Sequence, residues 1–263
     1  MKVLFIKNRK FLYLFSIIFA LILLLSIFFV YNSKSFAVDF EKNSFFNVDV
    51  SISLNDIEKS TDKKAYLTFD DGPNPSITPK VLDILQKEDI KATFFVIGKN
   101  VDSYPDIVKR AYDEGHYIAN HGYDHNNSHL YKNNESFIDE VKSTDIAIGK
   151  AIGIENYCAH VFRFPNGFMS PSNKSKKKKA ALLLFKMNYT YIDWNCLNND
   201  SVKKYSSSQL LNNLKKSSKN KNTLVVLMHD TKDVSNSSLV LEDSINYLKS
   251  EGYTFQNFYD LIG

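Results

Sequence analysis

Beyond about residue 62, short apolar runs alternate along the chain with longer segments in which apolar residues recur every three or four positions. The apolar runs predict buried strands, which we place at residues 65–69, 92–98, 160–165, 189–195, 223–230 and, more briefly, 253–258. The periodic segments predict amphipathic helices at residues 79–88, 104–115, 134–153, 178–188, 207–218 and 239–252. Alternating strands and helices of these lengths indicate an α/β fold with a parallel sheet, either a barrel or an open sheet.

Polar residues stand at or near the ends of these predicted strands, and this placement favours the (β/α) barrel. They are Asp70, Asp71, Arg163, Asp193, Asp200, His229 and Asp230. In such a barrel the carboxyl ends of the strands gather on one face, where active-site residues lie. The pattern therefore predicts an active site built from the ends of several strands.

The N-terminus carries a different pattern, an uncharged apolar run at residues 11–31 that follows Lys2, Lys7, Arg9 and Lys10. A helix of this length spans roughly 30 Å, the thickness of a bilayer core. The basic flank is expected to stay in the cytoplasm. We expect an uncleaved anchor over a cleaved signal peptide, for which Ser35 and Ala37 are the small residues available.

This pattern divides the chain into a flank and single-pass transmembrane anchor (1–32), a polar linker (33–62) and a folded domain (63–263). The hydrophobic share of 44% and the charged share of 24% are those of a globular protein. A formal charge of +4, with lysines concentrated only at 173–180, predicts no nucleic-acid partner. We interpret the lysine run at 176–179 as a solvated helix face. Cys158 and Cys196 do not make a disulfide framework, and we favour free thiols over a pair.

Histidines at positions 121, 125 and 129 are the clearest candidates for chemistry. On a helix, residues four apart lie on one face, so two of these imidazoles could chelate a divalent ion, although an exposed polar helix has the same pattern. Spacing alone does not separate the pair 121/125 from 125/129. A third ligand is available in TFDDGP (68–73), where adjacent carboxylates repel each other unless a cation or an arginine such as Arg163 lies close.

Six motifs in order resemble those of the polysaccharide deacetylases of carbohydrate esterase family four, which share the NodB-homology domain. They are TFDDGP (68–73), ATFFVIG (92–98), NHGYDH (120–125), RFPNG (163–167), DWNCLNND (193–200) and LMHD (227–230). The resemblance covers residues 63–262. It implies a distorted (β/α) barrel of seven or eight strands, and a divalent metal that is usually zinc, with cobalt or another divalent ion as an alternative. It also implies removal of N-acetyl groups from a glycan.

Carried over by motif, the resemblance makes Asp71, His121 and His125 the metal ligands and leaves His129 as an exposed residue one turn further along. It makes Asp70 the general base, which Arg163 orients, and His229 the general acid, which Asp200 tunes. It assigns the backbone N–H of Asn166 to the oxyanion hole and Leu227 and Pro165 to the substrate groove.

Two positions depart from the family pattern. Gly122 replaces the Ser or Thr that is common after the first metal histidine, so we expect a hydrogen bond that steadies the loop between the ligands to be missing and metal affinity to be lower. Ser201 stands where many members have a tryptophan in the substrate groove. Trp194 is the only tryptophan and fits the strand pattern, so we expect it in the core.

These features together predict an extracytoplasmic, metal-dependent deacetylase of N-acetylhexosamine residues in a cell-surface polysaccharide, with N-acetylglucosamine of peptidoglycan as the first substrate. Alternatives within this class are muramic residues, chitin-like or exopolysaccharide chains, and O-acetyl esters. An inactive glycan-binding module and a structural anchor are alternatives from other classes, but neither explains a base and an acid together. No protein partner is predicted.

Overall fold

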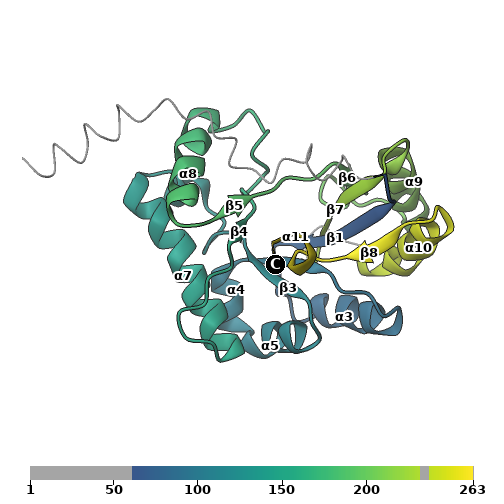
Figure 1. Ribbon diagram of the computed structural model, residues 1–263, viewed down its shortest axis with the longest axis horizontal. Helices are drawn as coiled ribbons and strands as arrows, with labels where there is room; N and C mark the ends of the chain where they lie inside the picture. The colour runs from purple at the N-terminus through teal and green to yellow at the C-terminus, as the bar shows by residue number, and fades with distance from the viewer. Residues whose placement is uncertain (1–60, 232–236, 263) are drawn as a thin grey trace, which may run out of the picture. The chain divides into compact units, whose positions relative to one another are not determined.

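The computed structural model describes residues 61–231 and 237–262, which form one parallel sheet with helices on its faces (Figure 1). The strands are β1 (Lys64–Asp70), β2 (Thr93–Val96), β3 (Tyr117–Asn120), β4 (Val161–Phe162), β5 (Thr190–Tyr191), β6 (Cys196–Leu197), β7 (Thr223–His229) and β8 (Thr254–Gln256). Their order is β5-β4-β3-β2-β1-β7-β6, with β8 paired to β1. The parallel α/β prediction is confirmed, as a curled half-barrel whose two outer strands, β5 and β6, do not pair with each other.

The centre of the sheet is β1, which has three neighbours. All seven of its residues pair with β7, from Lys64 opposite Thr223 to Asp70 opposite His229. Its other edge is shared, because β8 pairs with Lys64–Tyr66 and β2 pairs with Thr68–Asp70. This arrangement places the end of β1 between the ends of β2 and β7.

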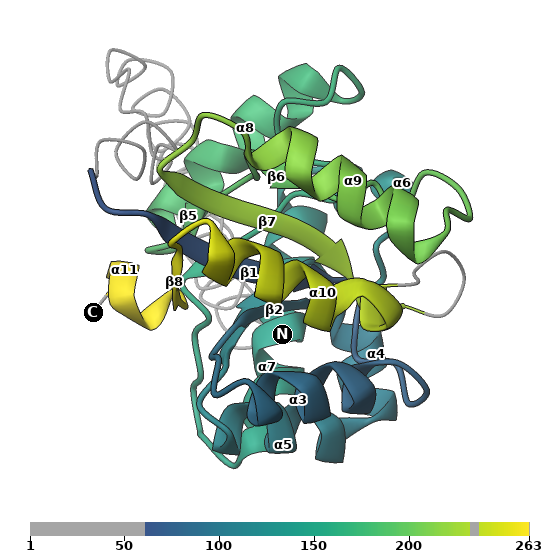
Figure 2. The same cartoon turned by 90° about the vertical axis from the view of Figure 1, so that its right-hand side faces the viewer.

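Helices surround the sheet: α3 (Thr78–Lys87), α4 (Gly98–Ser103), α5 (Pro105–Asp113), α6 (Asn127–Leu130), α7 (Asn134–Ile152), α8 (Lys174–Lys186), α9 (Ser207–Ser218), α10 (Ser237–Ser250) and α11 (Tyr259–Ile262). Figure 1 shows α7 and α8 beside β3, β4 and β5, whereas Figure 2 shows α9 and α10 side by side next to β7. The long helix α7 has clear ends. The Asn133 side chain accepts a hydrogen bond from the N–H of Ser136, and Gly153 ends the helix with φ of 76°.

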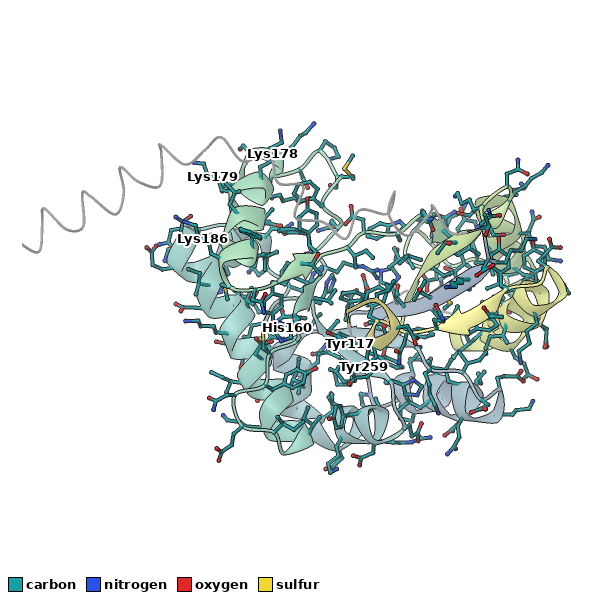
Figure 3. All side chains as sticks on the ribbon, viewed as in Figure 1. Tyr117, His160, Lys178, Lys179, Lys186 and Tyr259 are labelled. Carbon is teal, nitrogen blue, oxygen red and sulfur yellow. The ribbon has the colours of Figure 1, made fainter. Side chains whose placement is uncertain are left out.

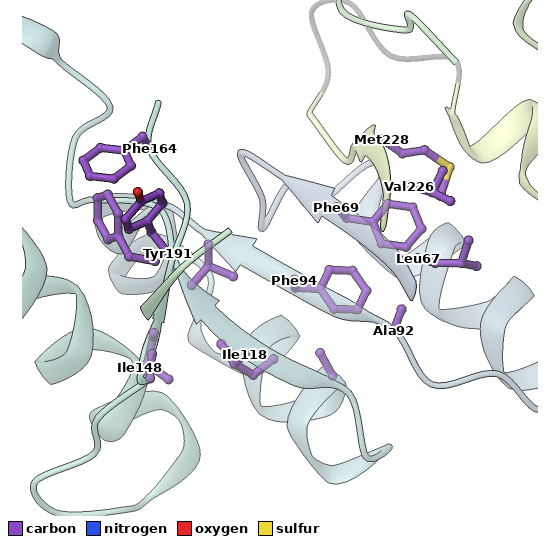
Figure 4. Packing of buried hydrophobic residues seen from close by; sticks show 14 of the residues in the cluster. Leu67, Phe69, Ala92, Phe94, Ile118, Ile148, Phe164, Tyr191, Val226 and Met228 are labelled. Atoms are coloured by element: carbon purple, nitrogen blue, oxygen red, sulfur yellow. The ribbon is translucent and has the colours of Figure 1, made fainter. Parts of the chain in front are cut away.

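Alternation along the strands separates two sets of buried side chains. On β1, Ala65, Leu67 and Phe69 join the large cluster beneath the helices, together with residues such as Phe94 and Met228 (Figure 4). Tyr66 belongs instead to a second, smaller cluster on the opposite face. Because side chains alternate across a strand, Thr68 and Asp70 share the face of Tyr66. The end of that inner face is where the polar residues gather.

The structure corrects several sequence-based assignments. Residues 117–120 form β3 and were not predicted as a strand, and the expected strand at 189–195 is reduced to the two residues of β5. The short strand β6 and the helix α4 were also missed. Helix α8 begins at Lys174, four residues before the predicted start. Each error falls on a short or very polar segment, where hydrophobic periodicity is weak.

In the two stretches that the structure describes, no helix is both long and apolar enough to cross a membrane. The proposed anchor at residues 11–31 lies outside those stretches. Cys158 and Cys196 are both free thiols, as favoured from the sequence, and Cys196 is buried.

Candidate active site

Side chains from four strands converge at the carboxyl ends of the sheet. Asp70 ends β1 and lies opposite His229, which ends β7. His121 and Arg163 directly follow β3 and β4. Because side chains alternate between the two faces along each strand, all four of these side chains point to the inner face of the sheet. Residues distant in sequence therefore meet at this end of the sheet.

Asp71 and two histidines form a compact group of potential metal ligands. The Oδ1 atom of Asp71 lies 3.4 Å from Nε2 of His121 and 3.4 Å from Nε2 of His125. This oxygen is buried, and no hydrogen-bond partner for it is found among the described residues. One carboxylate and two imidazoles are a set that suits zinc. An orphaned carboxylate oxygen facing two ring nitrogens therefore fits a divalent cation, as predicted.

The charges of Asp71, His121 and His125 shift one another's pKa values. Burial raises the pKa of Asp71, but the close approach and charge of His121 and the charge of His125 outweigh burial, so that this pKa lies well below its usual range. Burial lowers the pKa of His121, yet the charges of Asp70 and Asp71 raise it overall. Burial and the charge of His121 lower the pKa of His125. The two carboxylates thus favour a positive charge between the imidazoles, which a divalent cation also supplies.

The spacing of the three histidines fits one face of a helix, but the structure does not place them on one. His121 and His125 lie in a loop, and only His129 is in the short helix α6. Left-handed backbone at Gly122 (φ 84°) and His125 (φ 56°) interrupts any helix between them. The His129 side chain is 67% exposed and pairs with Asp124, 2.9 Å away, so the structure brings together 121 and 125 and leaves 129 aside.

Asp70 is held by the buried guanidinium of Arg163. Nη1 of Arg163 donates to Oδ1 of Asp70 at 2.8 Å and to the hydroxyl of Thr68 at 2.7 Å. Its Nε donates to the carbonyl of Ile192, and the guanidinium carbon lies 3.9 Å from the ring centroid of Phe95. The other oxygen of Asp70, Oδ2, is 3.8 Å from Nε2 of His121. One oxygen of Asp70 is therefore oriented by Arg163 while the other faces the candidate metal site.

Replacing Arg163 by Met is expected to destabilise the fold by about 3–5 kcal/mol, because removal of one member of a buried ion pair leaves the other charge unpaired. Urea denaturation of the full-length protein measures this loss. The matched control is Lys178→Met, which removes an exposed charge and should change stability by no more than about 0.5 kcal/mol. Equal stability of the two variants would mean that the Arg163–Asp70 pair contributes nothing.

His229 and Asp200, which the sequence resemblance made the general acid and its tuning carboxylate, lie in direct contact. Oδ1 of Asp200 lies 2.8 Å from Nδ1 of His229, and Oδ2 accepts the backbone N–H of the same residue at 2.8 Å. Burial lowers the pKa of His229, but the hydrogen bond and charge of Asp200, with the charges of Asp70 and Asp71, raise it to about 9. The contact with Asp200 occupies Nδ1 of the His229 ring, and a raised pKa suits a proton donor.

The RFPNG loop presents the backbone of Asn166 at the same end of the sheet. Asn166 has φ of 63°, and its side chain is exposed. Nearby, the carboxylate of Asp193 accepts the N–H groups of Phe168 and Met169 at 2.8 and 2.9 Å. A ring atom of Trp194 lies 2.8 Å from where a Cβ on Gly167 would stand, so only glycine fits. Trp194 therefore supports this loop and is only partly buried.

The lysine run is only in part a solvated helix face. Lys178 and Lys179 are exposed on α8, as Figure 3 shows, but Lys177 is buried. Its ammonium donates to the carbonyl of Gly167 at 2.5 Å. This contact cannot be read from the sequence, because the four consecutive lysines at 176–179 differ only in the direction in which each leaves the helix.

Sequence reasoning left Asp230 without a role, although the structure buries it behind TFDDGP. Its Oδ2 accepts the hydroxyl of Thr78 at 2.6 Å, and burial raises its pKa to about 7. A Cβ atom added at Gly72 would lie only 2.2–2.5 Å from the Asp230 carboxylate. Residue 72 therefore has to be a glycine. The only sequence feature that pointed to Asp230 was its position next to His229 at a strand end.

Leu227 and Pro165, the predicted substrate contacts, are both buried, and their contact with a glycan stays a prediction.

Comparison with known proteins identifies the family. The family described as polysaccharide deacetylase matches residues 57–187. A peptidoglycan-N-acetylglucosamine deacetylase of Bacillus cereus is 36% identical over 203 residues, which are 75% of this chain and 70% of that protein. The chain belongs to the polysaccharide deacetylase family. The peptidoglycan-N-acetylmuramic acid deacetylase PdaA of Bacillus subtilis is 31% identical over 201 residues, or 76% of this chain and 72% of PdaA.

Solved structures of polysaccharide deacetylases agree with this assignment. A CE4 esterase of Streptococcus mutans superposes with a TM-score of 0.70 at 31% identity, covering 79% of this chain and 90% of the esterase. The resemblance noted from the six motifs is thereby confirmed, as is the half-barrel fold. As a polysaccharide deacetylase, the protein is a hydrolase that releases acetyl groups.

Proposed function

We propose that this polysaccharide deacetylase is metal-dependent and removes the N-acetyl group from N-acetylglucosamine residues of peptidoglycan. The observation that carries the proposal is the orphaned oxygen of Asp71 between His121 and His125, beside an Asp70 held by Arg163. The substrate is proposed from the first relative, which acts on that sugar by name. Asp71, His121 and His125 would hold the cation, with zinc as the first choice and cobalt as an alternative.

When bound, the cation supplies Lewis-acid polarisation of the acetyl carbonyl. Asp70 accepts a proton from the attacking water through its free oxygen, while Arg163 holds the carboxylate in place. The backbone N–H of Asn166 donates to the oxygen that gains negative charge. An amine anion cannot leave, so protonated His229 gives its proton to the departing nitrogen, and Asp200 holds the ring for that transfer.

Asp200→Asn is expected to move the alkaline limb of the kcat/KM profile to lower pH. His229 acts in its protonated form, so activity falls as the pH rises through its pKa, which Asp200 helps to raise to about 9. Removing that carboxylate lowers the pKa, and the fall in activity then begins at lower pH. The profile is measured between neutral and strongly alkaline pH with the full-length protein. A limb that keeps its position in the variant would exclude His229 as the acid.

The position of the lost acetyl group tests the substrate. Peptidoglycan treated with the full-length enzyme is digested with a muramidase, and mass spectrometry of the fragments locates the free amine. We expect it on glucosamine. A free amine on muramic residues instead would make the protein an N-acetylmuramic acid deacetylase, the activity for which PdaA is named. Acetate released only from O-acetyl esters would make the protein an esterase.

We also propose that residues 11–31 anchor the enzyme in the cell membrane with its catalytic domain outside the cytoplasm. The support is the uncharged apolar run after a basic flank, and the place where peptidoglycan is found. Recovery of the intact chain in the membrane fraction, accessible to external protease, is the expected result. A mature chain that begins near residue 38 in the medium would show a cleaved signal peptide.

A further inference from the structure

The loop that carries both metal histidines is held by hydrogen bonds on two sides. The carbonyls of Gly122 and Tyr123 accept the N–H groups of Gly98 and Lys99, at the start of α4, at 3.0 and 2.8 Å. The N–H of Gly122 donates to the side chain of Asn120 at 2.9 Å. These contacts satisfy the start of the loop, but they leave the N–H groups that precede His125 without a backbone partner.

Glu140, on α7, supplies that partner. Its Oε2 accepts the N–H of Tyr123 at 2.7 Å and the N–H of Asp124 at 3.2 Å. The residue is only 9% exposed. A carboxylate that accepts two backbone N–H groups in a buried place makes charge-assisted bonds, which are stronger than neutral ones. Glu140 therefore fixes the two peptides that lie between His121 and His125.

This support matters most for His125. The His121 ring is buried and has a second anchor, since its Nδ1 lies 2.8 Å from the carbonyl oxygen of Arg163. His125 is 31% exposed, and its Nδ1 has no hydrogen bond to any residue that the structure describes. Its left-handed backbone, with φ of 56°, sets the direction of the ring. A shift of the preceding peptides would therefore turn His125 away from Asp71.

We propose that Glu140 is a positioning residue that directs His125 toward the cation and so sets the metal affinity of the site. This role replaces the bond that the sequence suggested would be missing at Gly122, whose Cβ, if present, would lie 3.6 Å from Oε2 of Glu140. Asp124, His129 and Glu140 also bring potential ligand atoms within 4.8 Å of one another. Asp124 and His129 already pair with each other and Glu140 bonds to the loop, so we do not assign a second metal to them.

The inference rests on the proposed metal site, and zinc binding to the full-length protein, measured by calorimetry, tests both. Glu140→Leu is expected to weaken zinc binding by about 10- to 100-fold, the usual cost of losing support behind a ligand. Glu140→Asp keeps the charge but withdraws the oxygen, and should weaken binding in the same direction. Glu140→Gln keeps an oxygen in place but loses the charge, and should weaken binding less than either of the other two variants. Asp139→Asn, next to Glu140 and exposed, is the matched control.

Zinc affinity unchanged in both Glu140→Leu and Glu140→Asp would overturn the role, and the Asp variant decides alone if the Leu variant does not fold. Wild-type affinity in Glu140→Asp together with a loss in Glu140→Gln would also overturn it, since charge rather than contact would then matter. Wild-type protein that binds no zinc would overturn the metal site itself, and this inference with it.

Discussion

Asp70→Asn is expected to lower kcat by about 10²- to 10⁴-fold while the protein keeps its zinc. The amide has the shape of the carboxylate but cannot take a proton from water. Arg163 holds one oxygen of Asp70 at 2.8 Å, and the other oxygen is 3.8 Å from His121. Asp70 is thus beside the metal ligands without being one of them in our proposal. Rates of acetate release, together with zinc content, measure the two effects separately.

The control for Asp70→Asn is Asp71→Asn, the same substitution one residue later. It should lose zinc as well as activity, because Oδ1 of Asp71 is the oxygen that faces both histidines. If Asp70→Asn lost its zinc while Asp71→Asn retained it, the roles of the two aspartates would be exchanged. Full activity in Asp70→Asn would remove the base from the mechanism.

His121→Ala is expected to abolish zinc binding and, with it, deacetylation. This histidine is 3% exposed, faces Asp71 at 3.4 Å and is fixed by the carbonyl of Arg163. A two-ligand remnant of Asp71 and His125 leaves zinc short of the three protein ligands of a catalytic site. Calorimetric titration with zinc and an assay of acetate release measure the two losses.

His129→Ala is the matched control, since it removes the same side chain at the same spacing from His125. Zinc affinity should not change, because His129 is 67% exposed and pairs with Asp124 outside the site. Loss of zinc in His129→Ala, with binding preserved in His121→Ala, would show that the ligand pair is 125/129. The sequence alone had left that choice open.

Much of the fold and the site followed from the sequence for a definite physical reason. Asp70 and His229 end long apolar strands, and both strands pair over their whole length. A polar residue at the end of such a strand is costly unless it faces a site. Strand ends therefore identified the acids and the histidine, and the family motifs assigned their roles.

Other features depended on conformations that residue spacing does not reveal. The spacing of His121, His125 and His129 fits a helix, but left-handed backbone at Gly122 and His125 makes a loop. Glu140 looked like an ordinary helix position in the sequence, and its function depends on which loop α7 meets. Lys177 differs from its neighbours only through burial against Gly167. Such contacts arise from packing between elements distant in sequence.

Acetate release from purified peptidoglycan by the full-length protein tests the central proposal most directly. The assay compares zinc-loaded enzyme, the same enzyme treated with a chelator, and Asp70→Asn. We expect release by the zinc-loaded enzyme, loss of release after chelation with recovery when zinc returns, and very slow release by the variant. Release that survives chelation, or that Asp70→Asn carries out at the wild-type rate, would contradict a metal-dependent deacetylase with Asp70 as its base.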